Sequence, residues 1–224
     1  QEEIVKILDN FTELEAELEA ELEAELEARK KQYDYYRDDL MKFGDIVKYK
    51  NLSEIVKLSR GVRVVKKQLE DVGKYPVYQN SMKPLGYYQE KNNKADTTFI
   101  ITAGSAGEVG YSNIDFWAAD DCFSLICSSN IKSRFLFHYL KTKQEFLFSR
   151  VRRASVPRIS RIVIEKIEIP IPPISEQERI ISILDEFDAL VNDISIGLPA
   201  ELKARRQQYE YYRNKLLTFK EYVG

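Results

Sequence analysis

The sequence predicts an α+β fold in which a β-rich middle domain is flanked by two long helical segments that pack antiparallel. The first observation behind this prediction is a repeat. Residues 4–43 return as residues 180–219 at a constant offset of 176 without a gap, so that Tyr36 matches Tyr212. The second observation is the unrelated middle, where short β-prone runs alternate with turn residues. A repeat on both sides of an unrelated middle indicates one structural element used twice.

The first copy is predicted to be a single helix. It is dominated by strong helix formers, and residues 1–43 contain no glycine or proline. The ELEA run from Glu13 to Ala28 alternates apolar and polar residues as a strand would, but it has no β-branched or aromatic residue. A long helix is stable when its apolar stripe packs on another helix, and the second copy is the expected partner. We expect the residues that face a dimer or partner helix to be Leu14, Leu18, Leu22, Leu26, Tyr33, Tyr36, Tyr209 and Tyr212.

The middle is predicted to be a mixed domain. Gly44 is expected at the C′ position of the first helix, and strands are expected at 76–78, 97–102, 122–127 and 162–169. An amphipathic helix is expected over 131–148, and the glycines at 104, 107 and 110 indicate a tight turn between two strands. The GSAG sequence lacks the Gly-Lys-Ser/Thr ending of a phosphate-binding loop, and no helix pattern follows it.

The second copy differs from the first. Ser175 to Glu178 read as a capping box that starts a helix. Gly197 and Pro199 are expected to break that helix, with Pro199 in the first turn of a new one. The resulting domain organisation is a long helix over 1–43, a middle domain over 44–174 and a helical region over 175–224.

The sequence contains no recognisable set of catalytic residues. His138 is the only histidine, so a histidine-based triad is excluded, and Asp120-Asp121 has no evident third acidic ligand for a metal. The amino-methyltransferase motif (Asn or Asp, then Pro-Pro-aromatic) and the Pro-Asp dipeptide of many nucleases are both missing. Cys122 and Cys127 are expected to be reduced core residues of a cytoplasmic protein, because there is no signal peptide and no apolar run long enough for a bilayer. We therefore expect a non-enzymatic chain with no catalytic residue, metal or cofactor of its own.

Charge is strongly segregated along the chain. Residues 44–170 carry 21 Lys and Arg against 13 Asp and Glu, a net of +8, and the flanking segments carry 13 against 23, a net of −10. The basic residues of the middle cluster, as in the five arginines of 149–161, which could also form a solubilising loop. Arginine forks bind phosphates and guanine edges, so the clusters favour a module that reads double-stranded DNA. The residues expected to contact DNA are Arg60, Arg63, Lys66, Lys67, Gln79, Asn80, Lys83, Ser105, Arg150, Arg152, Arg153 and Arg158.

Several stretches together resemble one known family. They are IPIPPISEQERI at 169–180, ILD at 183–185, LPAELKARRQQYEYYR at 198–213, YPVY at 75–78, GYY at 86–88, GSAG at 104–107 and FWA at 116–118. The sequence resembles specificity subunits of type I restriction–modification systems. In that family, target recognition domains read DNA and conserved helices bind methyltransferase subunits. The resemblance implies these partners, and further the restriction subunit; S-adenosylmethionine would be bound by the methyltransferase.

Full-length members have two recognition domains, each reading half of a bipartite site, whereas this sequence has one. It also begins inside the repeated motif, because Gln1-Glu2 matches Gln177-Glu178. We therefore expect a half subunit that acts as a homodimer on an interrupted palindrome, with LEAE units that set the gap. Two alternatives remain open: a coiled-coil scaffold whose middle domain binds a protein, and a stand-alone DNA-binding regulator.

Overall fold

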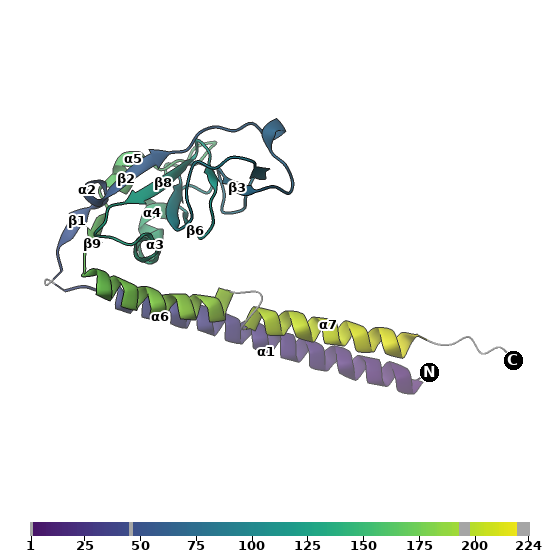
Figure 1. Ribbon diagram of the computed structural model, residues 1–224. Coiled ribbons are helices and arrows are strands. Elements are labelled where there is room, and N and C mark those ends of the chain that lie inside the picture. Colours follow the sequence, from purple (N-terminus) through teal and green to yellow (C-terminus); the bar gives the residue numbers. More distant parts are fainter. Residues whose placement is uncertain (1, 45–46, 193–197, 219–224) are drawn as a thin grey trace. The chain divides into compact units, whose positions relative to one another are not determined.

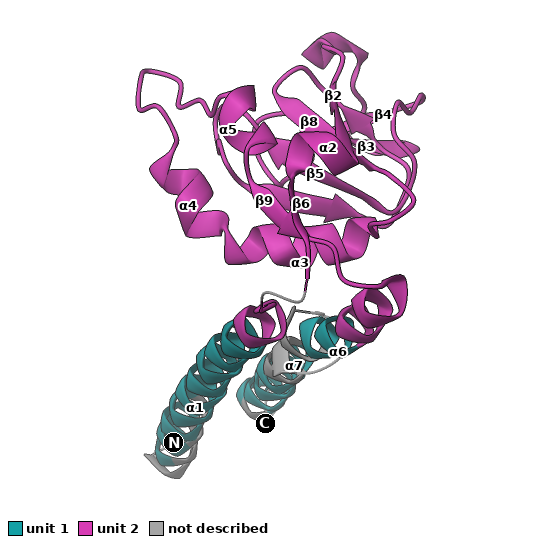
Figure 2. Cartoon of the chain, turned by 90° about the vertical axis from the view of Figure 1, so that its left-hand side faces the viewer, with its two compact units in different colours: residues 1–36, 183–224 teal, residues 37–182 magenta. Residues whose placement is uncertain are grey.

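The computed structural model describes residues 2–44, 47–192 and 198–218, and the chain divides into two compact units (Figure 2). Unit 1 comprises residues 1–36 and 183–224, and unit 2 comprises residues 37–182. The long helices are α1 (Glu2–Leu40), α6 (Ile174–Asn192) and α7 (Leu198–Leu217). None of the helices in the described ranges is long and apolar enough to cross a membrane.

Unit 1 is an antiparallel helical arrangement, as the sequence predicts (Figure 1). The hydroxyl groups of Thr12, early in α1, and Tyr209, in α7, are 3.1 Å apart. Tyr36, late in α1, stacks on Phe187 of α6 with ring centroids 5.6 Å apart. The beginning of α1 therefore contacts α7 and its later part contacts α6, which is the order that antiparallel packing produces.

Only part of the predicted leucine stripe is covered within the chain. Leu22 is 8% exposed, Leu18 and Leu26 are half-buried, and Leu14 remains 61% exposed. Exposed pairs one helical turn apart, such as Arg29 with Glu25 at 3.3 Å, line the polar face. Pairs of this kind stabilise a helix by a few tenths of a kcal/mol at most, so the burial of Leu22 contributes more to the stability of α1.

The second copy consists of two helices, as predicted. Helix α6 ends at Asn192 and α7 begins at Leu198 with Pro199 in its first turn, while Gly197 lies outside the described residues. The predicted capping box is wrong, because α6 begins at Ile174 and places Ser175 inside the first turn rather than at the N-cap.

Gln177 anchors the first turn of α6 instead. Its side chain is fully buried; its amide nitrogen donates to the carbonyls of Pro172 (2.9 Å) and Asn130 (3.0 Å), and its oxygen accepts from the Lys132 amide (2.9 Å). One buried side chain thus satisfies three backbone groups that would otherwise be costly to bury.

The core of unit 2 is a four-stranded antiparallel sheet in the order β2-β8-β5-β6. Its strands are β2 (Val56–Arg60), β5 (Thr97–Ile101), β6 (Val109–Ser112) and β8 (Cys122–Cys127). Helix α3 (Ser133–Thr142) contacts it, with Phe135 and Leu140 fully buried. The hydroxyl group of Thr98 donates to the Ser133 carbonyl at 2.7 Å, which fixes the start of α3 on β5.

A second sheet has the order β4-β3-β7, with β3 and β7 parallel. Its strands are β3 (Tyr75–Tyr78), β4 (Tyr87–Tyr88) and β7 (Trp117–Ala118). The predicted strands around 76–78, 97–102 and 122–127 are thus present. The helix expected over 131–148 is interrupted at Lys143, which separates α3 from α4 (Gln144–Ser149). His138 is buried in α3, and both cysteines are free, with Cys122 fully buried.

Within unit 2, one pair of strands precedes and follows the two larger sheets. Strand β1 (Tyr49–Asn51) is antiparallel to β9 (Glu168–Pro170), and Tyr49 is opposite Pro170. Two short helices connect this pair to the rest, α2 (Leu52–Ile55) and α5 (Arg161–Glu165).

Two predictions in these connections are wrong. The strand expected over 162–169 is instead helix α5 followed by the shorter β9, because Ser160 caps the helix by accepting from the Val163 amide at 3.4 Å. Gly44 is not a C′ residue, because α1 ends at Leu40.

Candidate nucleic-acid interface

The ends of β2 and β5 and the start of β8 lie side by side at one end of the central sheet. Arg60, the last residue of β2, is opposite Phe123, and Ile101, the last residue of β5, is opposite Cys122, the first residue of β8. Neighbouring strands are antiparallel, so the segments that follow β2 and β5 and the one that precedes β8 emerge together. Residues distant in sequence are thereby placed on one surface.

The first basic segment is the loop of residues 61–67, which we call the lysine loop. The Arg60 Nε donates to the Asp120 carbonyl at 3.1 Å, and the Val62 amide donates to the Ala118 carbonyl at 2.9 Å. A Cβ at Gly61 would lie 2.1 Å from the Ala119 carbonyl oxygen, so this close approach requires glycine. The loop is therefore anchored against β7 and leaves Arg63, Lys66 and Lys67 exposed, the two lysines in the 3-10 turn η1 (Lys66–Gln68).

The second basic segment is the loop of residues 150–158, which we call the arginine loop. The backbones of Arg152 and Arg158 exchange two hydrogen bonds of 2.8 and 3.2 Å. The Gly104 amide donates to the Pro157 carbonyl at 3.1 Å, which ties the loop to the end of β5. The side chains of Arg152, Arg153 and Arg158 are exposed.

The glycine turn between β5 and β6 links a third segment. Gly104 and Gly107 have φ of +83° and +89°, which L side chains rarely adopt. The Ser105 amide donates to the Asn80 carbonyl at 2.9 Å. The turn that the glycine spacing predicts is thus present, and it places Ser105 beside Asn80.

Asp121 is where these segments meet. Its carbonyl accepts from the Thr102 amide at 2.7 Å, and its carboxylate Oδ1 is 3.8 Å from Nη1 of Arg158. The preceding residue, Asp120, is the one that Arg60 contacts. Among the described residues, no group of three or more His, Cys, Asp or Glu is placed to hold a metal ion. The Asp120-Asp121 turn therefore joins the lysine and arginine loops. Sequence reasoning considered this pair only as metal ligands, and no local pattern predicts the joining role.

The remaining predicted DNA contacts are placed differently. Gln79 is half-buried directly after β3, and Lys83 is exposed while its carbonyl accepts from the Ser81 hydroxyl at 3.0 Å. The Arg150 guanidinium lies over the ring of Phe146, 5.1 Å from its centroid. Phe146 belongs to α4, the helix whose Gln144 side chain donates to the Gly107 carbonyl of the glycine turn at 2.7 Å.

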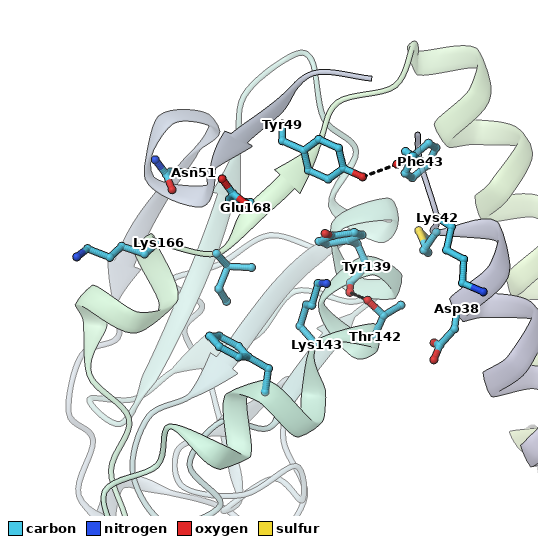
Figure 3. Close-up of a pocket in the computed structure, with 13 residues that line it drawn as sticks. Asp38, Lys42, Phe43, Tyr49, Asn51, Tyr139, Thr142, Lys143, Lys166 and Glu168 are labelled. Atoms are coloured by element: carbon cyan, nitrogen blue, oxygen red, sulfur yellow. Dashed lines mark hydrogen bonds between the residues drawn. The ribbon is translucent and has the colours of Figure 1, made fainter. Parts of the chain in front are cut away.

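A pocket with a volume of about 880 Å³ lies within unit 2 (Figure 3). It is lined by residues that include Tyr49 and Asn51 of β1, which precede β2, whereas Arg60 ends β2. It is also lined by Phe146 of α4, the ring over which the Arg150 guanidinium lies. Burial raises the pKa of Tyr139 to about 12, and the Tyr49 hydroxyl donates to the Phe43 carbonyl at 2.9 Å. No sequence pattern predicted this pocket.

The predicted partner-facing tyrosines of unit 1 are divided. Tyr33 is 9% exposed, so it belongs to the unit's own core. Tyr209 is half-buried against Thr12, whereas Tyr36 and Tyr212 are 41% and 46% exposed. Tyr36 and Tyr212 therefore still have surface available for a partner.

The chain is similar in sequence to specificity subunits of type I restriction systems. A specificity subunit of a type I restriction enzyme from Escherichia coli is 35% identical over 98% of this chain, which spans 59% of that protein. Two type I specificity subunits of Mycoplasma pneumoniae are 34% and 32% identical over 98% of this chain, which spans 83% and 92% of them.

Solved structures share the fold. The S subunit of a type I restriction–modification system from M. genitalium superposes with a TM-score of 0.73 at 21% identity, over 97% of this chain and 60% of that one. The HsdS subunit from Thermoanaerobacter tengcongensis gives a TM-score of 0.62 at 14% identity, over 96% and 57%. The family model described as the type I restriction modification DNA specificity domain matches residues 45–204. With a match over most of its length and relatives above 30% identity, this chain belongs to the DNA-specificity family of type I restriction–modification systems.

Proposed function

We propose that this chain reads one half of a bipartite DNA site and docks the methyltransferase subunits of a type I complex. The observation that carries the proposal is the convergence of the lysine loop, the arginine loop and the glycine turn at one end of one sheet. They belong to a segment, residues 44–170, with a net charge of +8 from 21 basic and 13 acidic residues. A clustered basic surface on a compact domain is the electrostatic signature of nucleic-acid binding.

The twelve predicted contact residues fit this role because none of them is buried. Exposed arginines suit guanine edges and phosphates, lysines suit phosphates, and Gln79 and Asn80 suit adenine edges. The domain that carries them corresponds to residues 44–174, between the helical segments 1–43 and 175–224.

The described chain carries one such surface, so a homodimer would present two. An isologous dimer has two-fold symmetry, and two-fold symmetry in the protein calls for a palindrome in the DNA. The exposed Leu14 of α1 supplies apolar surface for helix packing beyond that made within the chain.

The length of α1 would set the gap between the half-sites. The ELEA run lies within one continuous helix, and four added residues lengthen a helix by about 6 Å. An added LEAE unit should therefore widen the gap in the palindrome by about two base pairs, because B-DNA rises 3.4 Å per pair.

The methyltransferase would dock on the helical segments. Tyr35 and Tyr36 form an edge-to-face pair at 5.6 Å and 75°, and their repeat partners Tyr211 and Tyr212 do so at 5.4 Å and 74°. Tyr35 and Tyr211 are 66% and 60% exposed. Two equivalent exposed aromatic pairs suit two copies of one partner. The methyltransferase would bind S-adenosylmethionine, the restriction subunit would complete the complex, and the assembly would act in the cytoplasm.

Selection from random duplexes, by the chain together with its methyltransferase subunit, tests the proposal. We expect an interrupted palindrome, with a wider gap for a variant that has one more LEAE unit. An asymmetric site would reject the homodimer, and no enrichment at low salt would reject DNA reading in favour of a protein-binding scaffold.

A matched pair of lysine variants tests which surface is used. Lys67→Ala should weaken binding to all sequences and reduce the slope of affinity against salt by about one charge. Lys50→Ala, in β1 at the other end of the sheet, removes the same exposed charge and should change neither. Equal effects of the two variants would place the interface elsewhere.

A further inference from the structure

We infer that Arg158 reads a guanine edge in the DNA major groove and that Asp121 is the residue that positions its guanidinium. The inference rests on the proposed function and goes further, because it separates one base-reading residue from the basic residues that contact phosphates. The supporting observations are the hydrogen bonds that fix the backbones of Arg158 and Asp121 and the ion pair between their side chains.

The backbone of Arg158 is fixed from two sides. It exchanges two hydrogen bonds with Arg152, and it is bridged to Ala103 on its other side. The next amide, of Ile159, donates to the Thr102 carbonyl at 3.0 Å. Arg158 is therefore the point where the arginine loop joins the end of β5. A side chain that reads a base edge needs such a fixed origin, because hydrogen bonds to bases tolerate little displacement.

Asp121 is fixed on the same strand end. Its carbonyl accepts from both the amide of Thr102, at 2.7 Å, and the hydroxyl of Thr102, at 3.0 Å. Its side chain is 20% exposed, whereas that of Arg158 is 62% exposed. The half-buried carboxylate, 3.8 Å from Nη1, attracts one side of the guanidinium, and most of the arginine side chain stays exposed to solvent.

Charge decides between a base and a phosphate as the target of this arginine. Of the arginines described in the lysine and arginine loops, Arg158 alone has a carboxylate at ion-pair distance. A phosphate brought to Arg158 would approach that carboxylate and be repelled. A base edge is neutral, and guanine presents O6 and N7 at the spacing of the arginine fork.

The carboxylate would add to this selectivity. A carboxylate oxygen accepts hydrogen bonds from the amino group of cytosine. Asp121 therefore suits a cytosine beside the guanine and disfavours a base that presents only acceptors in the groove. The Arg158–Asp121 pair would therefore present one hydrogen-bond donor and one hydrogen-bond acceptor side by side to the base edges.

The test substitutes single atoms in the DNA. Once the preferred site has been selected, each guanine is replaced in turn by 7-deazaguanine, which lacks the N7 acceptor. We expect the wild-type chain, in complex with its methyltransferase subunit, to lose about fivefold or more in affinity at one guanine. Arg158→Ala should bind the two duplexes equally at that position and should accept other bases there on renewed selection.

Asp121→Asn provides the readout for positioning. It keeps the backbone carbonyl that holds Thr102, so the melting temperature should be preserved, while the sensitivity to 7-deazaguanine should fall. Asp120→Asn, the same change one residue earlier, should keep the full sensitivity, and so should Lys67→Ala, although Lys67→Ala binds more weakly overall.

Three results would overturn the inference. One is an Arg158→Ala variant that binds every sequence more weakly but keeps its sensitivity at each guanine, since Arg158 would then contact phosphate. Another is a selected site in which no guanine responds to 7-deazaguanine. Failure of the wild-type chain to prefer any duplex would reject the proposed function as well, and is distinguishable from the first two.

Discussion

The indole Nε1 of Trp117 donates a hydrogen bond of 2.8 Å to the carbonyl oxygen of Val62. Trp117 belongs to β7 in the smaller sheet, and Val62 is the second residue of the lysine loop, which follows β2 of the central sheet. The Val62 amide also donates to the Ala118 carbonyl. Both backbone groups of Val62 are therefore bonded to β7, and these two bonds hold the lysine loop against that strand. The position of three exposed cations therefore depends on an aromatic residue that need not contact DNA.

Trp117→Phe should loosen the lysine loop. Loss of one hydrogen bond should lower the free energy of unfolding by about 0.5–1.5 kcal/mol, and affinity should fall for all DNA sequences alike. Tyr111→Phe is the control, because it removes a hydrogen bond of the same length, from Tyr111 to Asp96, on β6. Equal DNA affinities of the two variants would show that the Trp117 hydrogen bond does not position the loop.

Gly61→Ala should be strongly destabilising. The new Cβ would lie 2.1 Å from the carbonyl oxygen of Ala119, and backbone atoms cannot move aside as a flexible side chain can. We expect a loss of about 3 kcal/mol or more in denaturant unfolding, as for other severe steric clashes. Gly44→Ala, where nothing lies within 4 Å of the new Cβ, should change stability little.

Gln177→Leu should destabilise unit 2. The substitution removes the partners of the Lys132 amide and of the carbonyls of Asn130 and Pro172. Each backbone group left unpaired costs about 1–3 kcal/mol, so the loss of unfolding free energy should exceed 2 kcal/mol. The same change at Gln208, which is exposed in α7, should have an effect within about 0.5 kcal/mol. Similar losses at both positions would contradict the anchoring role.

Alkaline pH should destabilise the fold through Tyr139. Burial raises the pKa of Tyr139 to about 12, whereas an unfolded tyrosine titrates near about 10. Between these values the unfolded chain has released the proton and the folded chain has kept it. Stability from this group is therefore complete below about pH 10 and is lost as the pH rises towards 12.

Tyr139→Phe should flatten this alkaline decline when unfolding by denaturant is followed from pH 9 to pH 11.5. Tyr35→Phe, at a ring that is 66% exposed, should leave the decline unchanged. Part of the slope should persist in both variants, because burial also raises the pKa of the Cys127 thiol to about 11.

The sequence predicts those features that depend on local pattern. Composition identifies α1 as a helix in spite of the strand-like alternation of its ELEA run, and Pro199 marks the start of α7. The positive-φ glycines 104 and 107 mark the β5–β6 turn. Each of these signals lies within a few residues of the structure that it specifies.

The errors arise where a neighbouring residue overrides a pattern. Alternating Ile and Val from 162 predict a strand, yet Ser160 caps a helix there and the strand begins only at Glu168. The sequence pattern also does not show that the Arg150 guanidinium lies over the ring of Phe146 in α4. Asp121 lies beside Thr102 and Arg158 because of the register between β5 and β8, and a single sequence does not reveal that register.

The opposition of Tyr49 and Pro170 in the β1–β9 pair has a consequence for how such a domain can change. The strands that precede and follow the two larger sheets are hydrogen-bonded neighbours, so the segment between them begins and ends at one place. The lysine loop follows the far end of β2 from that strand pair. A related segment grafted between β1 and β9 would have to match the three facing residue pairs of these strands and the backbone groups of Asn130 and Lys132 that Gln177 of α6 holds. So few points of attachment would let the middle segment be exchanged while the flanking helices are kept.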